Sequence, residues 1–183
     1  MVTSQTTRPS GGNRPLLGLR RKPGRLAIVF FRLPLKAYEH NAGPAVGRTF
    51  VAFTHVGRKT GQPYETVAMV LRDDAATGEA VICAAWGPQT DWYRNLLAHP
   101  AVKVQLGGQT LAPQQRVLPD GEAFDVAVQF RREHPHRLRF FSAVLGWGDL
   151  NDDARVREFI HTHPFVAFRP AQAPGRPAVG PEP

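Results

Sequence analysis

The segment at positions 54–63 constrains the fold of this chain more than any other part of its 183 residues. It places two cations, Arg58 and Lys59, between Gly57 and Gly61, and apolar runs typical of strands flank it on both sides. Two such runs joined by a short glycine-containing turn predict a β-hairpin. Glycines also permit φ > 0, which lets successive N–H groups point into one concavity, and the two cations add positive charge there. The segment therefore predicts a hairpin whose turn binds a phosphate or a carboxylate.

The same turn is also compatible with a plain, solvent-exposed hairpin tip. It is not a Walker A loop, because Arg58 occupies the position of the glycine that must precede the Lys-Thr pair. The sequence contains no glycine-rich dinucleotide fingerprint. A nucleotide-like cofactor bound at this turn therefore implies a fold other than the Rossmann and P-loop folds.

Hairpin patterns dominate the chain after this turn as well. The pair Gly107-Gly108 joins two further apolar runs, and a polar turn at 73–78 precedes a run apolar enough to form a central strand. Strands do not alternate with helices, which predicts an antiparallel barrel or sandwich with attached helices rather than a doubly wound sheet. The expected strands cover 48–56, 64–71, 79–85, 101–106, 109–118 and 164–169, and short helices are expected after a cap at Thr90 or Asp91 and over 122–132, 138–145 and 154–161.

Composition predicts one domain with disordered ends. The length suffices for a single core, and residues 1–15 and 170–183 are rich in Pro, Gly, Ser or Thr. Residues 16–169 are the expected domain, which begins with an amphipathic helix over about 23–38. The apolar run at 26–31 is too short to span a bilayer.

The positive charge of the chain is concentrated in its N-terminal arm. Residues 1–48 hold nine of the 23 Lys and Arg residues and one acid, Glu39, whereas the rest of the chain is electrically balanced. The segment at 20–36 combines basic and apolar residues, which predicts association with an anionic membrane surface. A helix that instead covers the cofactor pocket, or a solvated tail, explains the same composition. The arm lacks the interleaved aromatic residues of a nucleic-acid-binding surface, so nucleic acid is not expected as a partner.

A single cysteine, Cys83, excludes an internal disulfide and favours a cytoplasmic protein. Its apolar surroundings predict a buried structural thiol. A peripheral position on the inner face of the membrane is the alternative location if the basic arm binds lipid.

The histidine pairs at 134–136 and 161–163 lack nearby cysteines or a helical i, i+4 partner, so no metal is expected. No Ser-His-Asp or paired-carboxylate arrangement supports a hydrolase.

Several separate motifs occur in order over about residues 48–118. They are Gly57-Arg58-Lys59-Thr60-Gly61-Gln62-Pro63, Ala84-Ala85-Trp86-Gly87, Asp91-Trp92-Tyr93-Arg94-Asn95-Leu96, Ala98-His99-Pro100, and Val102-Lys103-Val104-Gln105 followed by Gly107-Gly108. In order and spacing these motifs resemble the deazaflavin-dependent nitroreductase family, and the strand at 165–168 supports the match.

The resemblance implies an α+β fold that is mainly an antiparallel split β-barrel with peripheral helices. It also implies bound coenzyme F-420, an 8-hydroxy-5-deazaflavin, whose reduced form transfers a hydride to quinone-like or nitro-type acceptors. Tyr93 and Trp92 are candidate catalytic residues, with core packing as the alternative for Trp92. By match with the family's motifs, the cofactor-binding residues are Arg58, Lys59, Thr60 and Gly61 on the phosphate side, and Ala84, Ala85, Trp86, Trp92 and Asn95 near the ring or the substrate.

The chain departs from the family pattern in two places. Relatives commonly carry an Arg directly after the Gln-Pro pair, where this chain has Tyr64. Relatives also hold the substrate with tyrosines in the C-terminal helical part, where this chain has Phe140, Phe141 and Trp147. The sequence therefore does not assign the acceptor, the proton donor, or the choice between monomer and homodimer. A split-barrel reductase that uses FMN or FAD, and a non-catalytic binder of a flavin, haem, bilin or lipid, are the alternative functions.

Overall fold

The computed structural model describes residues 47–74, 76–107, 109–111 and 113–170. The predicted helix over 23–38, the basic segment at 20–36 and the predicted disordered ends lie outside this part of the chain, except for Pro170.

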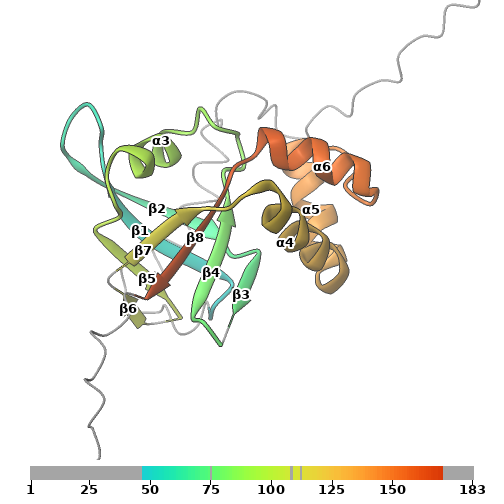
Figure 1. Ribbon diagram of the computed structural model, residues 1–183, viewed down its shortest axis with the longest axis horizontal. Coiled ribbons are helices and arrows are strands. Elements are labelled where there is room, and N and C mark those ends of the chain that lie inside the picture. Colours follow the sequence, from blue (N-terminus) through green and yellow to red (C-terminus); the bar gives the residue numbers. More distant parts are fainter. Residues whose placement is uncertain (1–46, 75, 108, 112, 171–183) are drawn as a thin grey trace, which may run out of the picture.

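Eight strands and four helices make up the described residues (Figure 1). The strands are β1 (Phe50–Val56), β2 (Pro63–Met69), β3 (Arg72–Asp74), β4 (Glu79–Cys83), β5 (Lys103–Leu106), β6 (Gln109–Leu111), β7 (Pro113–Val117) and β8 (Phe165–Pro170). They form two antiparallel sheets, one in the order β2-β1-β5-β6 and the other in the order β3-β4-β8-β7. The helices are α3 (Asp91–Ala98), α4 (Asp120–Glu133), α5 (Pro135–Leu145) and α6 (Asp153–Thr162). The predicted α+β fold with mainly antiparallel strands and peripheral helices is confirmed.

The predicted hairpins are confirmed by the strand pairing. Strands β1 and β2 pair antiparallel from Phe50 opposite Met69 to Val56 opposite Pro63, so that the glycine turn closes this hairpin. Strands β5 and β6 pair in the same way around Gly107. Each hairpin lies in the first sheet.

The chain passes from the first sheet to the second at both edges. At one edge, Val70 N–H donates to Thr49 O, and the next residue, Leu71, donates its N–H to Val81 O in the other sheet. At the other edge, β6 is followed by β7 of the second sheet. Within the described residues no strand ladder joins the two sheets, so they form a split barrel and not a closed one.

Strands β4 and β8 are buried on both faces, because successive side chains point to opposite sides of a strand. One set packs between the two sheets, in a cluster that we call the barrel core. The other set packs under α4, α5 and α6, in a cluster that we call the helix core (Figure 1). The barrel-core set is Ala80, Ile82, Val166 and Phe168, and the helix-core set is Val81, Cys83, Phe165 and Ala167.

Local sequence explains where the helices begin and end. The carboxylate of Asp152 accepts a hydrogen bond of 2.7 Å from Ala154 N–H and so caps α6. Helix α5 begins at Pro135, three residues before the predicted start, because proline is tolerated in the first turn. It ends at Leu145, before Gly146, which has a φ of 71°. Helix α3 follows Thr90 as predicted, but the Thr90 hydroxyl donates to Gly87 O and does not cap the helix.

Two predicted strands are each divided in the structure. The strand expected at 64–71 ends as β2 at Met69, and β3 begins three residues later at Arg72. The strand expected at 109–118 is likewise divided into β6 and β7. The chain changes sheet at both points, and the apolar pattern of the sequence does not mark that change. Strand β8 extends to Pro170, one residue into the predicted disordered end.

Two further features of the described residues bear on the sequence analysis. Cys83 is buried, as predicted, and burial raises the pKa of its thiol to about 12. No helix in this part of the chain has both the length and the apolar character needed to cross a membrane.

A buried carboxylate, Glu79, connects the second sheet to α4. Its side chain is 6% exposed and accepts two hydrogen bonds of 2.9 Å from Arg116, and Arg72 and Arg169 approach it at 3.5 and 3.3 Å. Arg116 and Arg72 also bind Glu122 in the first turn of α4. Burial alone raises the pKa of Glu79, but the hydrogen bonds and charges of Arg116 and Arg169 together outweigh burial and hold that pKa below its ordinary value. The hydrogen bonds from Arg116 lower the pKa of Glu122 to about 2.

We expect Glu79→Gln to lower the free energy of unfolding by about 2–3 kcal/mol, because it leaves partly buried arginines without their shared carboxylate. Urea unfolding monitored by circular dichroism measures the change. Glu158→Gln is the matched control, since the Arg155–Glu158 pair is exposed and its loss should change stability by less than about 0.5 kcal/mol. Equal effects of the two substitutions would show that the Glu79 network contributes no special stability.

Candidate functional site

The glycine turn between β1 and β2 is closed by its own hydrogen bonds. Gly57 N–H donates to Gln62 O and Gly61 N–H donates to Gly57 O, both at 2.8 Å. Thr60 N–H also donates to Gly57 O, and Gln62 N–H donates to the Thr60 hydroxyl at 3.3 Å. The expectation that these N–H groups point into an anion-binding concavity is therefore wrong. An anion at this turn must be bound mainly by side chains.

Two side chains pack closely over Gly57. A Cβ at this position would lie 2.4 Å from the Thr60 hydroxyl and 2.6 Å from the ring of Tyr64. The two side chains meet over the glycine, with 3.2 Å between the Thr60 and Tyr64 hydroxyls. Gly61 has a φ of 66° and open space around it, so it serves the turn through its backbone conformation. The two glycines thus have different roles in one turn.

Arg58 joins the turn to α3. Its backbone N–H and one guanidinium nitrogen both donate to Asn95 Oδ1, at 3.1 and 2.9 Å. The guanidinium also binds Asp91 at 3.1 Å. Asp91 and Asn95 are four residues apart and therefore lie on one face of the helix. The Arg58 side chain is 19% exposed, so it is directed along α3 and not into solvent.

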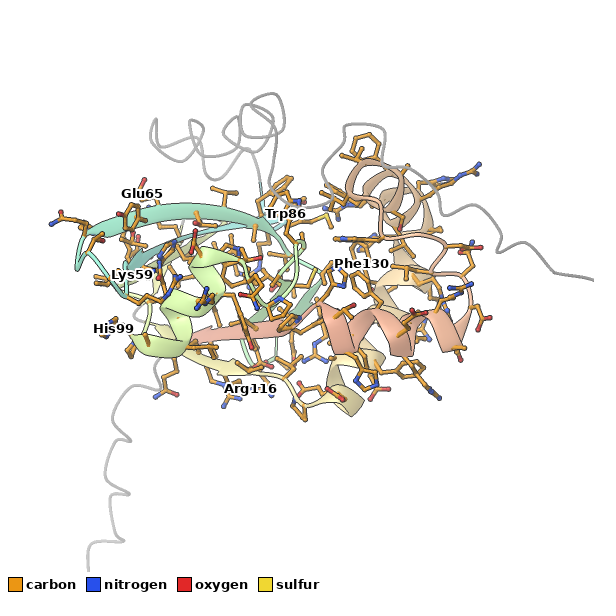
Figure 2. The ribbon with its side chains drawn as sticks, turned by 90° about the horizontal axis from the view of Figure 1, so that it is seen from above. Lys59, Glu65, Trp86, His99, Arg116 and Phe130 are labelled. Atoms are coloured by element: carbon orange, nitrogen blue, oxygen red, sulfur yellow. The ribbon has the colours of Figure 1, made fainter. Side chains whose placement is uncertain are left out.

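Unlike Arg58, Lys59 is not held against α3. It is exposed, and its ammonium has no hydrogen-bond or ion-pair partner among the described residues. Figure 2 shows Lys59 at the hairpin end of the molecule, away from Phe130 and the helix core. Lys59 therefore supplies the uncompensated positive charge of the turn.

A buried histidine lies behind this contact. His55 is 4% exposed, and its Nδ1 lies 3.1 Å from Asn95 Nδ2 while its Nε2 lies 3.1 Å from the Thr66 hydroxyl. Its ring stacks on Tyr64 with 5.9 Å between centroids. Burial lowers the pKa of His55, and the nearby charge of Asp91 opposes that shift in part. The sequence analysis did not single out His55.

The segment that contains Ala84, Ala85 and Trp86 connects β4 to α3. Ala84 is buried in the barrel core, and its N–H donates to Pro164 O at 2.8 Å. The carbonyl of Ala85 accepts a hydrogen bond of 3.0 Å from the indole N–H of Trp147, which lies between α5 and α6. Trp86 is half-buried. The segment is thus held by the loops around the helices, whereas the glycine turn is held by α3.

Trp92 and Tyr93, the candidate catalytic residues, both lie in the barrel core. They are 9% and 8% exposed, and the Trp92 ring packs edge-on against Phe53 with 5.4 Å between centroids. Burial raises the pKa of the Tyr93 phenol. Their catalytic roles stay predictions, and the structure provides the packing that the alternative for Trp92 requires.

A cavity in the described part of the chain is separate from these residues. It has a volume of about 300 Å³ and lies where β1 begins and α4 ends, at the opposite end of the β1–β2 hairpin from the turn. Its charged lining includes the ion pair between Arg48 and Asp73. It includes none of the predicted site residues. Among the described residues, no group of three or more His, Cys, Asp or Glu side chains is arranged to hold a metal ion.

Comparison with known proteins shows which protein family this chain resembles. Residues 30–138 match the profile of the family described as F420H(2)-dependent quinone reductase. A solved F420-H2 dependent reductase, FDR-A, is 20% identical, with 67% of this chain and 96% of that chain covered and a TM-score of 0.45. A pyridoxamine 5'-phosphate oxidase-related, FMN-binding protein from Nostoc punctiforme is 10% identical, with 80% of both chains covered and a TM-score of 0.41. A FAD-binding protein from Mesorhizobium loti is 17% identical, with 74% and 90% covered and a TM-score of 0.34.

Proposed function

This chain belongs to the F420H(2)-dependent quinone reductase family, and we propose that it transfers a hydride from reduced coenzyme F-420 to a quinone-like acceptor. Membership of the family makes it an oxidoreductase with coenzyme F-420 as its cofactor, in place of FMN or FAD. The observation that carries the proposed site is the cationic glycine turn held against α3, which lies within the matched residues.

The side chains of the turn fit the anionic part of this cofactor. Lys59 offers an ammonium with no partner among the residues that the structure describes, Thr60 a hydroxyl at the surface, and Arg58 a guanidinium held in one orientation by Asn95. Positively charged donors of this kind suit phosphate and carboxylate oxygens. Because the turn's own N–H groups are mostly engaged, Lys59 is the residue that we expect to contribute most to affinity.

The remaining predicted residues would orient the ring. Ala84, Ala85 and Trp86 form the segment that the family resemblance puts beside it, and the bond from Trp147 fixes the Ala85 carbonyl. When bound, the reduced coenzyme supplies the hydride, and a quinone acceptor becomes a hydroquinone by taking up that hydride and a proton. The protein's part is to orient the two partners and exclude water.

The helical part of the chain favours an apolar, planar acceptor. Phe140 and Phe141 on α5 lie edge to face with 5.3 Å between centroids, and Phe140 is 50% exposed. Phe141 is buried, so Phe140 is the ring that offers stacking surface, and it has no proton to donate. A quinone ring suits such a surface, and the matched family is described by quinone reduction, so we place quinones ahead of nitro compounds.

We expect the full-length protein to catalyse stereospecific deuteride transfer from labelled reduced coenzyme F-420 to menadione. Loss of absorbance of menadione together with deuterium analysis of the products measures the reaction. A control with the cofactor alone corrects for uncatalysed reduction. Tight binding of the coenzyme without turnover of any quinone in a panel would contradict the proposed acceptor class.

We expect Lys59→Ala to weaken binding of coenzyme F-420 by about 1.5–3 kcal/mol, because it removes a charge-assisted hydrogen bond to the anionic part. Titration monitored by tryptophan fluorescence measures the dissociation constant. Arg155→Ala is the control, since it removes the same charge from an exposed position on α6. If the two variants bind equally well, the turn does not hold the cofactor's anion.

Membrane association of the basic segment at 20–36 is a second part of the proposal, and it rests on sequence alone. Such a segment would bring the enzyme to lipid-soluble quinones, with each basic residue contributing roughly 1 kcal/mol near an anionic leaflet. We expect full-length protein to co-sediment with anionic vesicles at low salt, and the combined Arg20→Glu, Arg21→Glu and Lys22→Glu variant to remain in solution. If this variant pellets like the wild type, the proposed association is wrong. Weaker binding of coenzyme F-420 by the variant would instead indicate that the segment covers the pocket.

A further inference from the structure

The orientation of the Asn95 amide follows from its partners. Both groups of Arg58 that contact it, the backbone N–H and the guanidinium, are donors only. The atom that faces them must therefore be the oxygen, Oδ1. The amide nitrogen of Asn95 then faces His55 Nδ1, at 3.1 Å.

This orientation fixes the protonation state of His55. Asn95 Nδ2 is a donor, so His55 Nδ1 must accept and carries no proton. The proton of the neutral ring lies on Nε2, which faces the Thr66 hydroxyl at 3.1 Å. The ring is buried and its pKa is lowered by that burial, which agrees with a neutral imidazole.

The groups around the ring come from three elements. Helix α3 presents Asn95 and, farther away, the carboxylate of Asp91, whose charge favours a protonated imidazole. Strand β2 presents Thr66 and the stacked ring of Tyr64. The guanidinium of Arg58 lies on the far side of Asn95.

We propose that His55 is a positioning residue for coenzyme binding: by accepting from Asn95 it holds the amide oxygen toward Arg58, and thereby holds the glycine turn against α3. Protonation at Nδ1 would place an N–H against the Asn95 amide nitrogen. Asn95 would then turn or withdraw, and either movement breaks its two bonds to Arg58. This inference rests on the proposed function of the turn.

The sign of the pH dependence follows from the lowered pKa. His55 is neutral in the folded protein at pH values above its ordinary pKa of 6.5 and gains its proton only below that value. The bonds between Arg58 and Asn95 are therefore intact at neutral and alkaline pH and are lost on acidification. Affinity for coenzyme F-420 should fall in the same direction.

Two substitutions separate this role from a merely structural one. His55→Leu removes the acceptor for Asn95. His55→Asn can accept from Asn95 through its amide oxygen and does not titrate. We expect His55→Leu to weaken binding of coenzyme F-420 about five- to twentyfold at neutral pH, the scale of one or two lost hydrogen bonds. We expect His55→Asn to bind within about twofold of the wild type and to lose that part of the wild-type pH dependence which lies below about pH 6.5.

The measurements are fluorescence titrations of the three proteins between about pH 7.5 and about pH 5.5, together with nitrogen-15 NMR of the histidine rings without cofactor. The NMR spectrum should show a neutral His55 with its proton on Nε2. A proton on Nδ1, or the same affinity and pH profile in His55→Leu as in the wild type, would overturn the inference. A wild type that does not bind the coenzyme would refute the proposed function instead, and the NMR result would still decide the state of His55.

Discussion

The burial of β4 and β8 on both faces is the constraint on which the rest of this structure depends. Because alternate side chains enter two different cores, each strand needs a sheet on one side and helices on the other. That requirement explains why α4, α5 and α6 gather over one face of the second sheet and why the first sheet faces the other. The one charged side chain of β4 that is buried, Glu79, is stabilised by arginines from three strands of the same sheet. The glycine turn joins two strands of the first sheet, so it is constrained neither by burial on two faces nor by the Glu79 network.

The sequence predicted those parts of the fold that local chemistry determines. Both hairpins followed from apolar runs around glycine turns, and the ranges expected for α4, α5 and α6 begin and end within three residues of the observed helices. The two changes of sheet could not be predicted, because the apolar pattern does not mark the residue at which the hydrogen-bond partner changes, as it does between Val70 and Leu71. The predicted helix at 23–38 and the basic segment stay predictions, since they lie outside the described residues.

The sequence motifs singled out several residues of the candidate site, but they did not predict which of these residues contact one another. Arg58 and Asn95 were both singled out from motifs, but their shared hydrogen bonds connect positions 37 residues apart, which no local pattern reveals. His55 was missed because a histidine at the end of an apolar strand is usually interpreted as part of the core. A signal for it did exist: strand alternation puts position 55 on the same face as Val51 and Phe53, so a polar ring there needs partners when buried. The prediction that the N–H groups of the turn bind an anion was wrong, because most of them donate hydrogen bonds within the turn itself.

The two cations of the turn differ in how firmly they are held, and this difference bears on how an anion would bind. The ion pair between Arg58 and Asp91 is largely exposed on the Asp91 side, at 84%, and such pairs contribute only about 0–1 kcal/mol. An incoming phosphate can therefore replace Asp91 at little cost, while Asn95 keeps the Arg58 backbone in place. Lys59 has no partner to exchange within the described part of the chain. The turn thus combines a cation that is already oriented with one that is free to reach, which suits a ligand whose anionic groups extend over several positions.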